Sequence, residues 1–255
     1  MTISNFFGTK YIYFLSGLIT SLFLLSCESE EDFSCIIDSN TPIEKKILLD
    51  DLDQIGLYIK GNVTIEQGKE ASISLKGNSA LVDGLYTGVE NKKLIIELRS
   101  PYCTPTIPLE IIVKTPQITA FTLAEKSNTV VADFKNLQKL KIQVNSNSKV
   151  ALNELEGLNV LDISLQEGAH IISYKEIKEV DLLKVNIKGN GSFNGYPIAA
   201  QNVEIKIEGK GSCEVTALRR LEVDIIGNAN VNCMGMPKIH KRITRKATFT
   251  LQTKF

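Results

Sequence analysis

The feature that most constrains this 255-residue chain is a repeat in its second half. From about residue 118, short segments of alternating apolar and polar residues recur, each followed by a turn of small or polar residues. Alternation is the period of a half-buried β-strand, and Gly, Asn and Ser suit sharp corners. The last apolar residues of these segments are spaced by 21, 21, 22, 20, 18 and 18 residues: Leu123, Val144, Leu165, Ile187, Ile207, Ile225 and Ile243.

Steps of about 20 residues match one coil of a parallel β-helix, in which each coil is stable only against its neighbours. An immunoglobulin-like sandwich also has many short strands, but it would not keep the same turn chemistry in every unit. We therefore predict an all-β fold, a single-stranded, right-handed parallel β-helix (β-solenoid). About seven coils are expected between Leu123 and Leu251, the last one charged at its open edge.

Residues 45–116 also have the composition of β-structure, but their spacing is irregular. This N-terminal block is either the distorted start of the solenoid or a small β-layer that caps it. With the repeats of residues 117–255 it is expected to form one continuous domain. No convincing helical period occurs after residue 26. Strands are predicted at residues 57–59, 63–67, 71–76, 94–98 and 109–115.

Residues 1–26 are expected to be a signal peptide, because the apolar run 11–25 is shorter than the roughly 20 residues of a membrane span. The sequence Leu-Leu-Ser-Cys that ends at Cys27 resembles a bacterial lipobox. That resemblance implies a lipid on the Cys27 thiol that holds the protein to a membrane. Residues 27–44 form an expected tether, and its acidic run 28–32 resembles surface-export signals of Bacteroidetes-type lipoproteins. We expect a surface-exposed outer-membrane lipoprotein, or alternatively one that faces the periplasm.

The composition and the spacing of possible ligands favour neither nucleic acid nor a metal as partner. The chain has 29 Lys and Arg against 29 Asp and Glu, so no basic surface for nucleic acid is indicated. His170 and His240 are the only histidines, and neither has Cys, Asp or Glu at metal-ligand spacing. The glycine pairs at 189–191 and 209–211 precede strands instead of the helices that hold phosphate, so no cofactor is expected.

Four further cysteines follow Cys27. Cys35 and Cys103 lie outside the repeats, and export would permit a disulfide between the tether and the N-terminal block. The alternative is two unpaired thiols. Cys213 and Cys233 occupy inward positions of neighbouring coils but different columns, so we expect buried free thiols.

Tyr174 and Tyr196 each stand nine residues after an anchor, so we expect them on the outer face of adjacent coils. They could stack on a sugar, or they could form a plain aromatic ladder that steadies the solenoid. A basic cluster near the C-terminus could meet an anionic polysaccharide, or could simply be a solvated end. Its members are Lys238, His240, Lys241, Arg242, Arg245 and Lys246.

Over roughly residues 50–250 the chain resembles the putative auto-transporter adhesin, head GIN domain family of Bacteroidetes lipoproteins. The resemblance rests on residues 91–96, on the repeated small-residue turns, and on the closing stretch 221–237. The family pattern of strand, Gly-Ser-Gly, strand and Gly-x-Pro is departed from at Ala229 and at residues 167–169. The resemblance implies a β-solenoid on a lipid anchor.

The adhesin label describes an architecture more than a chemistry. The sequence favours a non-catalytic, adhesin-like binding or scaffold module that presents its outer face to a glycan or an envelope protein. A polysaccharide-active β-helix enzyme is one alternative, although no column of acidic residues is expected on one face. A purely structural envelope protein is the other.

Overall fold

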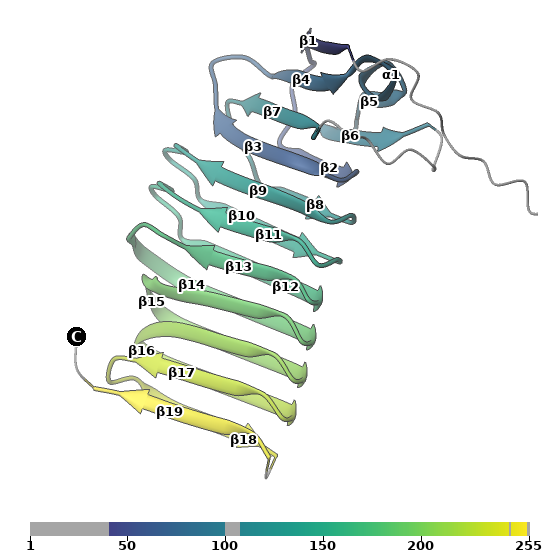
Figure 1. The fold of residues 1–255 in the computed structure, drawn as a ribbon. Helices are drawn as coiled ribbons and strands as arrows, with labels where there is room; N and C mark the ends of the chain where they lie inside the picture. The colour runs from purple at the N-terminus through teal and green to yellow at the C-terminus, as the bar shows by residue number, and fades with distance from the viewer. Residues whose placement is uncertain (1–40, 100–107, 245, 254–255) are drawn as a thin grey trace, which may run out of the picture. The chain divides into compact units, whose positions relative to one another are not determined.

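The computed structural model describes residues 41–99, 108–244 and 246–253, which lie in one compact unit, Cys35–Phe255. It confirms the predicted all-β class: 69% of it is strand and 2% is helix, and stacked parallel coils form a β-solenoid of about six turns (Figure 1). The predicted anchors form one column, since each pairs with the next from Leu123 to Ile243. Seven anchor strands thus bound about six turns.

Two strand-lined sides make up each coil. One side carries the anchors and is called the anchor side; the other follows the glycine-rich turn and is called the opposite side. β15 and β16 run around a corner and contribute to both. The anchor side contains β8 (Ala120–Leu123), β10 (Lys139–Val144), β12 (Val160–Glu167), β14 (Ile177–Gly189), β15 (Ser192–Gly209), β16 (Ser212–Gly227) and β18 (Lys238–Ile243). The opposite side contains β9 (Ser127–Ala132), β11 (Lys149–Leu152), β13 (His170–Ser173), the first residues of β15 and β16, β17 (Asn230–Met234) and β19 (Thr248–Gln252).

Alternation places every second side chain of these strands in the core. Leu123, Ile187 and Ile207 are 0% exposed, and each contributes roughly 1.5–3 kcal/mol by leaving water. Each core residue is covered by its counterparts in the coils on either side, so the stack is stable only as a whole.

The backbone geometry of the turns after the anchors explains why glycine occurs there. Gly209 and Gly227 are paired neighbours with φ of 130° and 133°, a conformation that other residues rarely adopt. A Cβ on either would clash with the carbonyl oxygen of the glycine one coil earlier. Glu167, in the same row, has a φ of only 55°, which a residue with a side chain tolerates.

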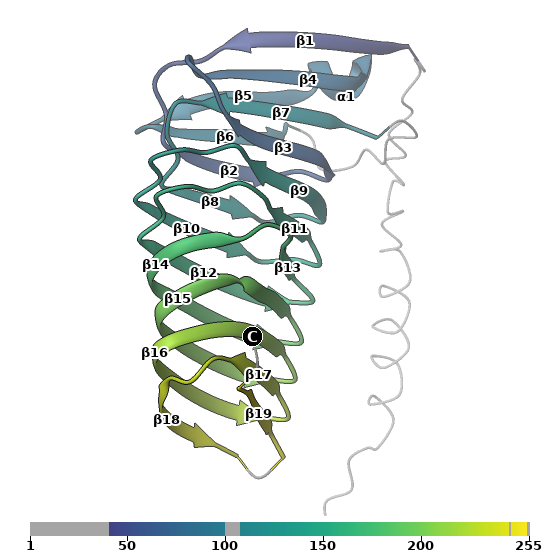
Figure 2. The same ribbon diagram turned by 90° about the vertical axis from the view of Figure 1, so that its left-hand side faces the viewer.

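The N-terminal block is both a continuation of the solenoid and its cap (Figure 2). The coil of β2 (Gln54–Tyr58) and β3 (Gly61–Gln67) pairs with β8 and β9 on one edge. On its other edge it pairs with β6 (Lys93–Leu98) and β7 (Glu110–Thr115), which come later in the chain. An earlier coil is therefore inserted between two later ones.

Antiparallel strands close this end. β4 (Ser72–Asn78) pairs with β7, β1 (Pro42–Leu48) pairs with β4, and β5 (Leu85–Glu90) pairs with β6. A single helical turn, α1 (Ser79–Asp83), joins β4 to β5 and is capped by the side chain of Asn78. The sequence pattern predicted neither α1 nor the strands β1 and β5, and β1 begins inside the segment assigned to the tether. Among the described residues, no helix is long and apolar enough to cross a membrane.

Candidate functional site

Three of the residues singled out by the sequence, Cys27, Cys35 and Cys103, lie outside the described residues. Lipidation and the disulfide therefore remain predictions. Cys213 and Cys233 are free and buried, as expected. They lie in neighbouring coils but pair with Val231 and Val215, so they occupy different columns. Burial raises the pKa of both thiols, which makes them packing residues and not nucleophiles.

The two tyrosines differ in their environment. Tyr174 is 65% exposed just after β13, whereas Tyr196 is partly buried within β15, where desolvation raises the pKa of its phenol. The register between β13 and β15 ends at Ile172 and Asn194, two residues before the tyrosines. The structure therefore gives no paired backbone that would hold the two rings as one platform.

The histidines are likewise separate. His170 is exposed at the start of β13 and hydrogen-bonds Ser192, whereas His240 lies on β18. Within the described ranges, no group of three or more His, Cys, Asp or Glu is placed to hold a metal ion.

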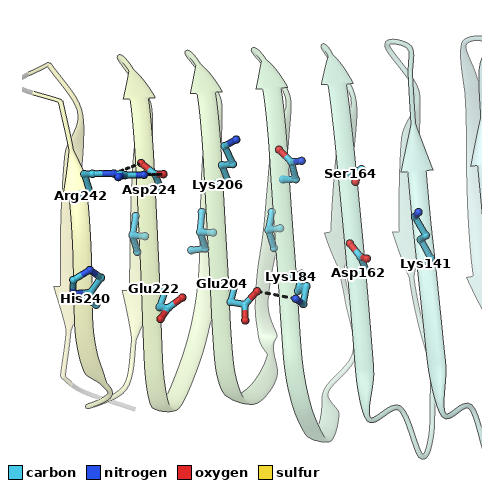
Figure 3. Close-up of a pocket in the computed structure, with 14 residues that line it drawn as sticks. Lys141, Asp162, Ser164, Lys184, Glu204, Lys206, Glu222, Asp224, His240 and Arg242 are labelled. Atoms are coloured by element: carbon cyan, nitrogen blue, oxygen red, sulfur yellow. Dashed lines mark hydrogen bonds and ion pairs between the residues drawn. The ribbon is translucent and has the colours of Figure 1, made fainter.

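A groove lies on the outer surface of the anchor side, and we call it the polar groove (Figure 3). It has a volume of about 570 Å³ and crosses the strands from β10 to β18. Its side chains form two rows, which stand three and one residues before each anchor. The first row is Lys141, Asp162, Lys184, Glu204, Glu222 and His240, and the second is Ser164, Asn186, Lys206, Asp224 and Arg242.

Strand register positions these rows. Within the first row, Lys184 pairs in the backbone with Glu204, and Glu204 pairs with Glu222. Neighbouring strands are about 4.8 Å apart, so each row presents a polar group at every step of the stack. Val185 and Ile205, between the rows, point inward and are 2% and 3% exposed. The groove thus stands on a packed core and not on loops.

Ion pairs order part of the groove. The Lys184 ammonium lies 2.9 Å from a Glu204 carboxylate oxygen, and hydrogen bonding to that carboxylate raises the pKa of Lys184. The Arg242 guanidinium donates to both carboxylate oxygens of Asp224 and lowers the pKa of that acid. The lining holds four Lys or Arg and four Asp or Glu, so its formal charge is balanced when His240 is neutral.

One buried polar atom of the groove lacks a hydrogen-bond partner in the described structure. The Oδ1 of Asn186 is buried and accepts no hydrogen bond in the described structure. An unsatisfied buried polar atom costs about 1–3 kcal/mol, so its presence requires an explanation such as strain, a functional role or a bound water. Asn186 is one of the residues that line the groove, so its amide is available to a ligand there.

The first row of the groove is mixed in charge and is not a column of acids, but it places the carboxylates of Glu204 and Glu222 on adjacent strands. Each has a basic partner, Lys184 for Glu204 and Arg220 for Glu222. None of the groove residues except His240 and Arg242 was considered from the sequence. The anchors alone could have indicated them, because the outward positions follow from the inward ones.

The architecture defines a class, a β-solenoid, and this one has a polar groove on an outer strand face. The chain belongs to the family described as "Putative auto-transporter adhesin, head GIN domain", whose model matches residues 51–237. No curated protein matches the chain.

Several solved structures share the fold. A putative adhesin from Bacteroides fragilis is 15% identical, with a TM-score of 0.74 over 84% of this chain and 97% of its own. A putative adhesin from Parabacteroides merdae is 19% identical, with a TM-score of 0.68 over 84% and 98%. A putative lipid binding protein from Parabacteroides distasonis is 19% identical, with a TM-score of 0.67 over 84% and 98%. At these identities the likeness shows the fold alone.

Proposed function

We propose that this protein is a non-catalytic binding module of the cell envelope, and that its polar groove binds an extended, hydroxyl-rich saccharide without net charge. The observation that carries the proposal is the balanced set of donors and acceptors repeated along the rungs of a rigid sheet. Family membership and the adhesin names of its structural neighbours support a binding role.

The lining favours a saccharide over other ligands. Ammonium and carboxylate groups alternate along the first row from Lys141 to Glu204, so one hydroxyl-rich chain can both donate and accept at successive rungs. A groove with balanced charge gives no general attraction to a polyanion or a polycation. Apolar side chains contribute only the packed floor, so hydrogen bonds would supply the specificity.

The carboxylate pair is the observation that favours the second candidate, a polysaccharide-cleaving enzyme. Two carboxylates flanking a glycosidic bond are the usual machinery of hydrolysis. Here Glu204 and Glu222 each have a basic partner, Lys184 and Arg220, so both carboxylates are already engaged in ion pairs. We therefore assign both residues to binding.

The membrane anchor belongs to the same proposal. A lipid on Cys27 would hold the groove at the cell envelope, with the outer surface as the expected location. Metabolic labelling with a radioactive fatty acid tests it: the full chain should become labelled, and the Cys27→Ala variant should not. Label that persists in the variant would contradict the assignment.

Binding is tested with the chain from residue 28 onward, which retains every described strand, on an array of neutral, zwitterionic and acidic glycans. We expect binding to members of the first two groups. Asn186→Ala should weaken it about tenfold, the usual scale of one lost hydrogen bond to a ligand. Asn194→Ala is the matched control, because Asn194 points outward at the start of β15, on the opposite side of the coil that Asn186 on β14 begins.

Two outcomes would overturn the proposal. One is equal loss of binding in the Asn186 and Asn194 variants, which would remove the groove from the interaction. The other is turnover of a bound polysaccharide that is abolished by Glu204→Gln or Glu222→Gln, which would make the protein an enzyme.

A further inference from the structure

The charge of the chain is unevenly distributed at its C-terminal end. Asp224 is the last acidic residue, and residues 225–255 carry six Lys or Arg and one His, although acids and bases are equal in number over the whole chain. Such a block of one sign indicates an interaction surface more than a requirement of folding.

Of these cations, Lys238, Lys241 and Arg242 lie on β18, and Lys246 lies just before β19 in the last coil. Each of these strands pairs on one edge only, with β16 and β17 respectively. Lys238 and Lys246 are exposed, and no ion pair involves either of them in the described part of the chain. Figure 1 shows this coil at the end of the stack away from β1.

Apolar side chains are exposed among the cations. Met236 is 74% exposed, and Leu218 and Leu251 are each 37% exposed. Leu218 and Met236 occupy the same corner of successive coils, because each lies between two registered pairs, Thr216–Met234 and Arg220–Lys238. Beside them the end of the core is only partly covered, at Ile239, Ile243 and Phe249.

We propose that this basic end docks on an anionic lipid surface. It is defined by Leu218, Met236, Lys238, Lys241, Lys246 and Leu251. Cations next to exposed apolar side chains suit the boundary between charged headgroups and acyl chains. A hydrated acidic polymer would use the cations but would gain nothing from Met236 and Leu251. A second copy of the same end would meet like charge. This surface is separate from the polar groove, so the two proposals stand independently.

Vesicle co-sedimentation tests the proposal, using the chain from residue 28 onward so that no lipid anchor contributes. Binding is expected to phosphatidylcholine vesicles that contain phosphatidylglycerol, but not to phosphatidylcholine alone, and it should weaken as salt is raised. Each basic side chain near such a surface contributes about fivefold, so Lys238→Gln with Lys246→Gln should weaken binding about 25-fold. The matched control is Lys45→Gln with Lys46→Gln, which removes the same charge from exposed positions on β1.

The contribution of the exposed apolar side chains to vesicle binding is tested with a second pair of variants. Met236→Ser should weaken vesicle binding severalfold, whereas Leu48→Ser, at a site that is 71% exposed on β1, should leave it unchanged. Thermal melts of all variants establish that they are folded. The proposal is overturned if the two lysine pairs have equal effects or if neutral vesicles bind as well. It is also overturned if dextran sulfate binds through the same lysines while vesicles do not, since the partner would then be a polymer.

Discussion

The two ends of the solenoid protect the end of the core and its open strand edges in different ways. At the N-terminal end, beyond the inserted coil of β2 and β3, strands pair antiparallel and cover the core together with α1. At the C-terminal end the parallel stack simply stops, and the described residues provide no strand beyond β18 and β19. A stack must be closed by structure or protected by charge, and this protein uses one device at each end.

One column of side chains runs between the two ends. Ile96 on β6 is its N-terminal member, covered by β5 and 0% exposed. Ile243 on β18 is its C-terminal member and is only partly buried. The two isoleucines therefore report directly on how well each end is closed.

The largest expected effect comes from truncating those isoleucines. Ile96→Ala should lower the free energy of unfolding by about 4 kcal/mol, because it removes a fully buried side chain and leaves a cavity. Ile243→Ala should cost only about 1 kcal/mol, since water already reaches that side chain. Urea unfolding measures both, with Ile207→Ala as a mid-column reference that should resemble Ile96→Ala. Equal losses at the two ends would mean that the C-terminal end is closed as well as the N-terminal one.

A smaller effect is expected from Lys241, which breaks an otherwise apolar inward column. Lys241 pairs with Val223 on β16, and its ammonium lies 4.9 Å from the centroid of the Phe249 ring. We interpret it as a charge that shields the end of the core and keeps other strands away. Lys241→Leu should raise the free energy of unfolding by about 1 kcal/mol and cause concentration-dependent association.

Thermal melts and sedimentation velocity measure the two consequences of Lys241→Leu. Lys238→Leu is the control, because it adds the same apolar group at an outward position of the same strand. A Lys241→Leu variant that stays monomeric would show that something other than this charge prevents end-to-end contact.

The same contrast explains what the sequence could predict. Regular coils stack in chain order, so their spacing alone gave the correct register from Leu123 to Ile243. The cap could not be read in this way, because β2 pairs with β6 and β8, which are distant in the chain. β1 was missed because an exposed edge strand, with the charged run 44–46, lacks the apolar alternation of a strand on the core.

The groove was missed for a related reason. Inward residues can be recognised in the sequence by their common apolar character, whereas outward residues such as Lys141, Asp162 and Lys184 differ in charge along the row. Their positions follow from the anchors, but their significance appears only when neighbouring coils are brought together. The unpartnered oxygen of Asn186 is visible only in three dimensions.

The smallest expected effect concerns how β18 is held at the open end. Arg242 on β18 donates to Asp224 on β16, and this hydrogen bond lowers the pKa of Asp224 from its ordinary value of 3.8. A lowered folded-state pKa stabilises the pair above the unfolded-state value, and that stabilisation is lost as pH falls through the folded-state pKa.

Hydrogen exchange in β18 should therefore rise as the pH is lowered below about 4, relative to that in β14, after correction for the intrinsic pH dependence of exchange. Asp224→Asn should produce the same local fraying at neutral pH, with little change in global stability because the pair is solvent-exposed. Asp162→Asn, on the same face but without an ion pair in the described structure, is the control and should leave β18 unchanged. If Asp224→Asn leaves exchange in β18 unaltered at neutral pH, backbone pairing with β16 alone holds the last strand. The open end would then depend on charge only for protection from other chains, and not for its own order.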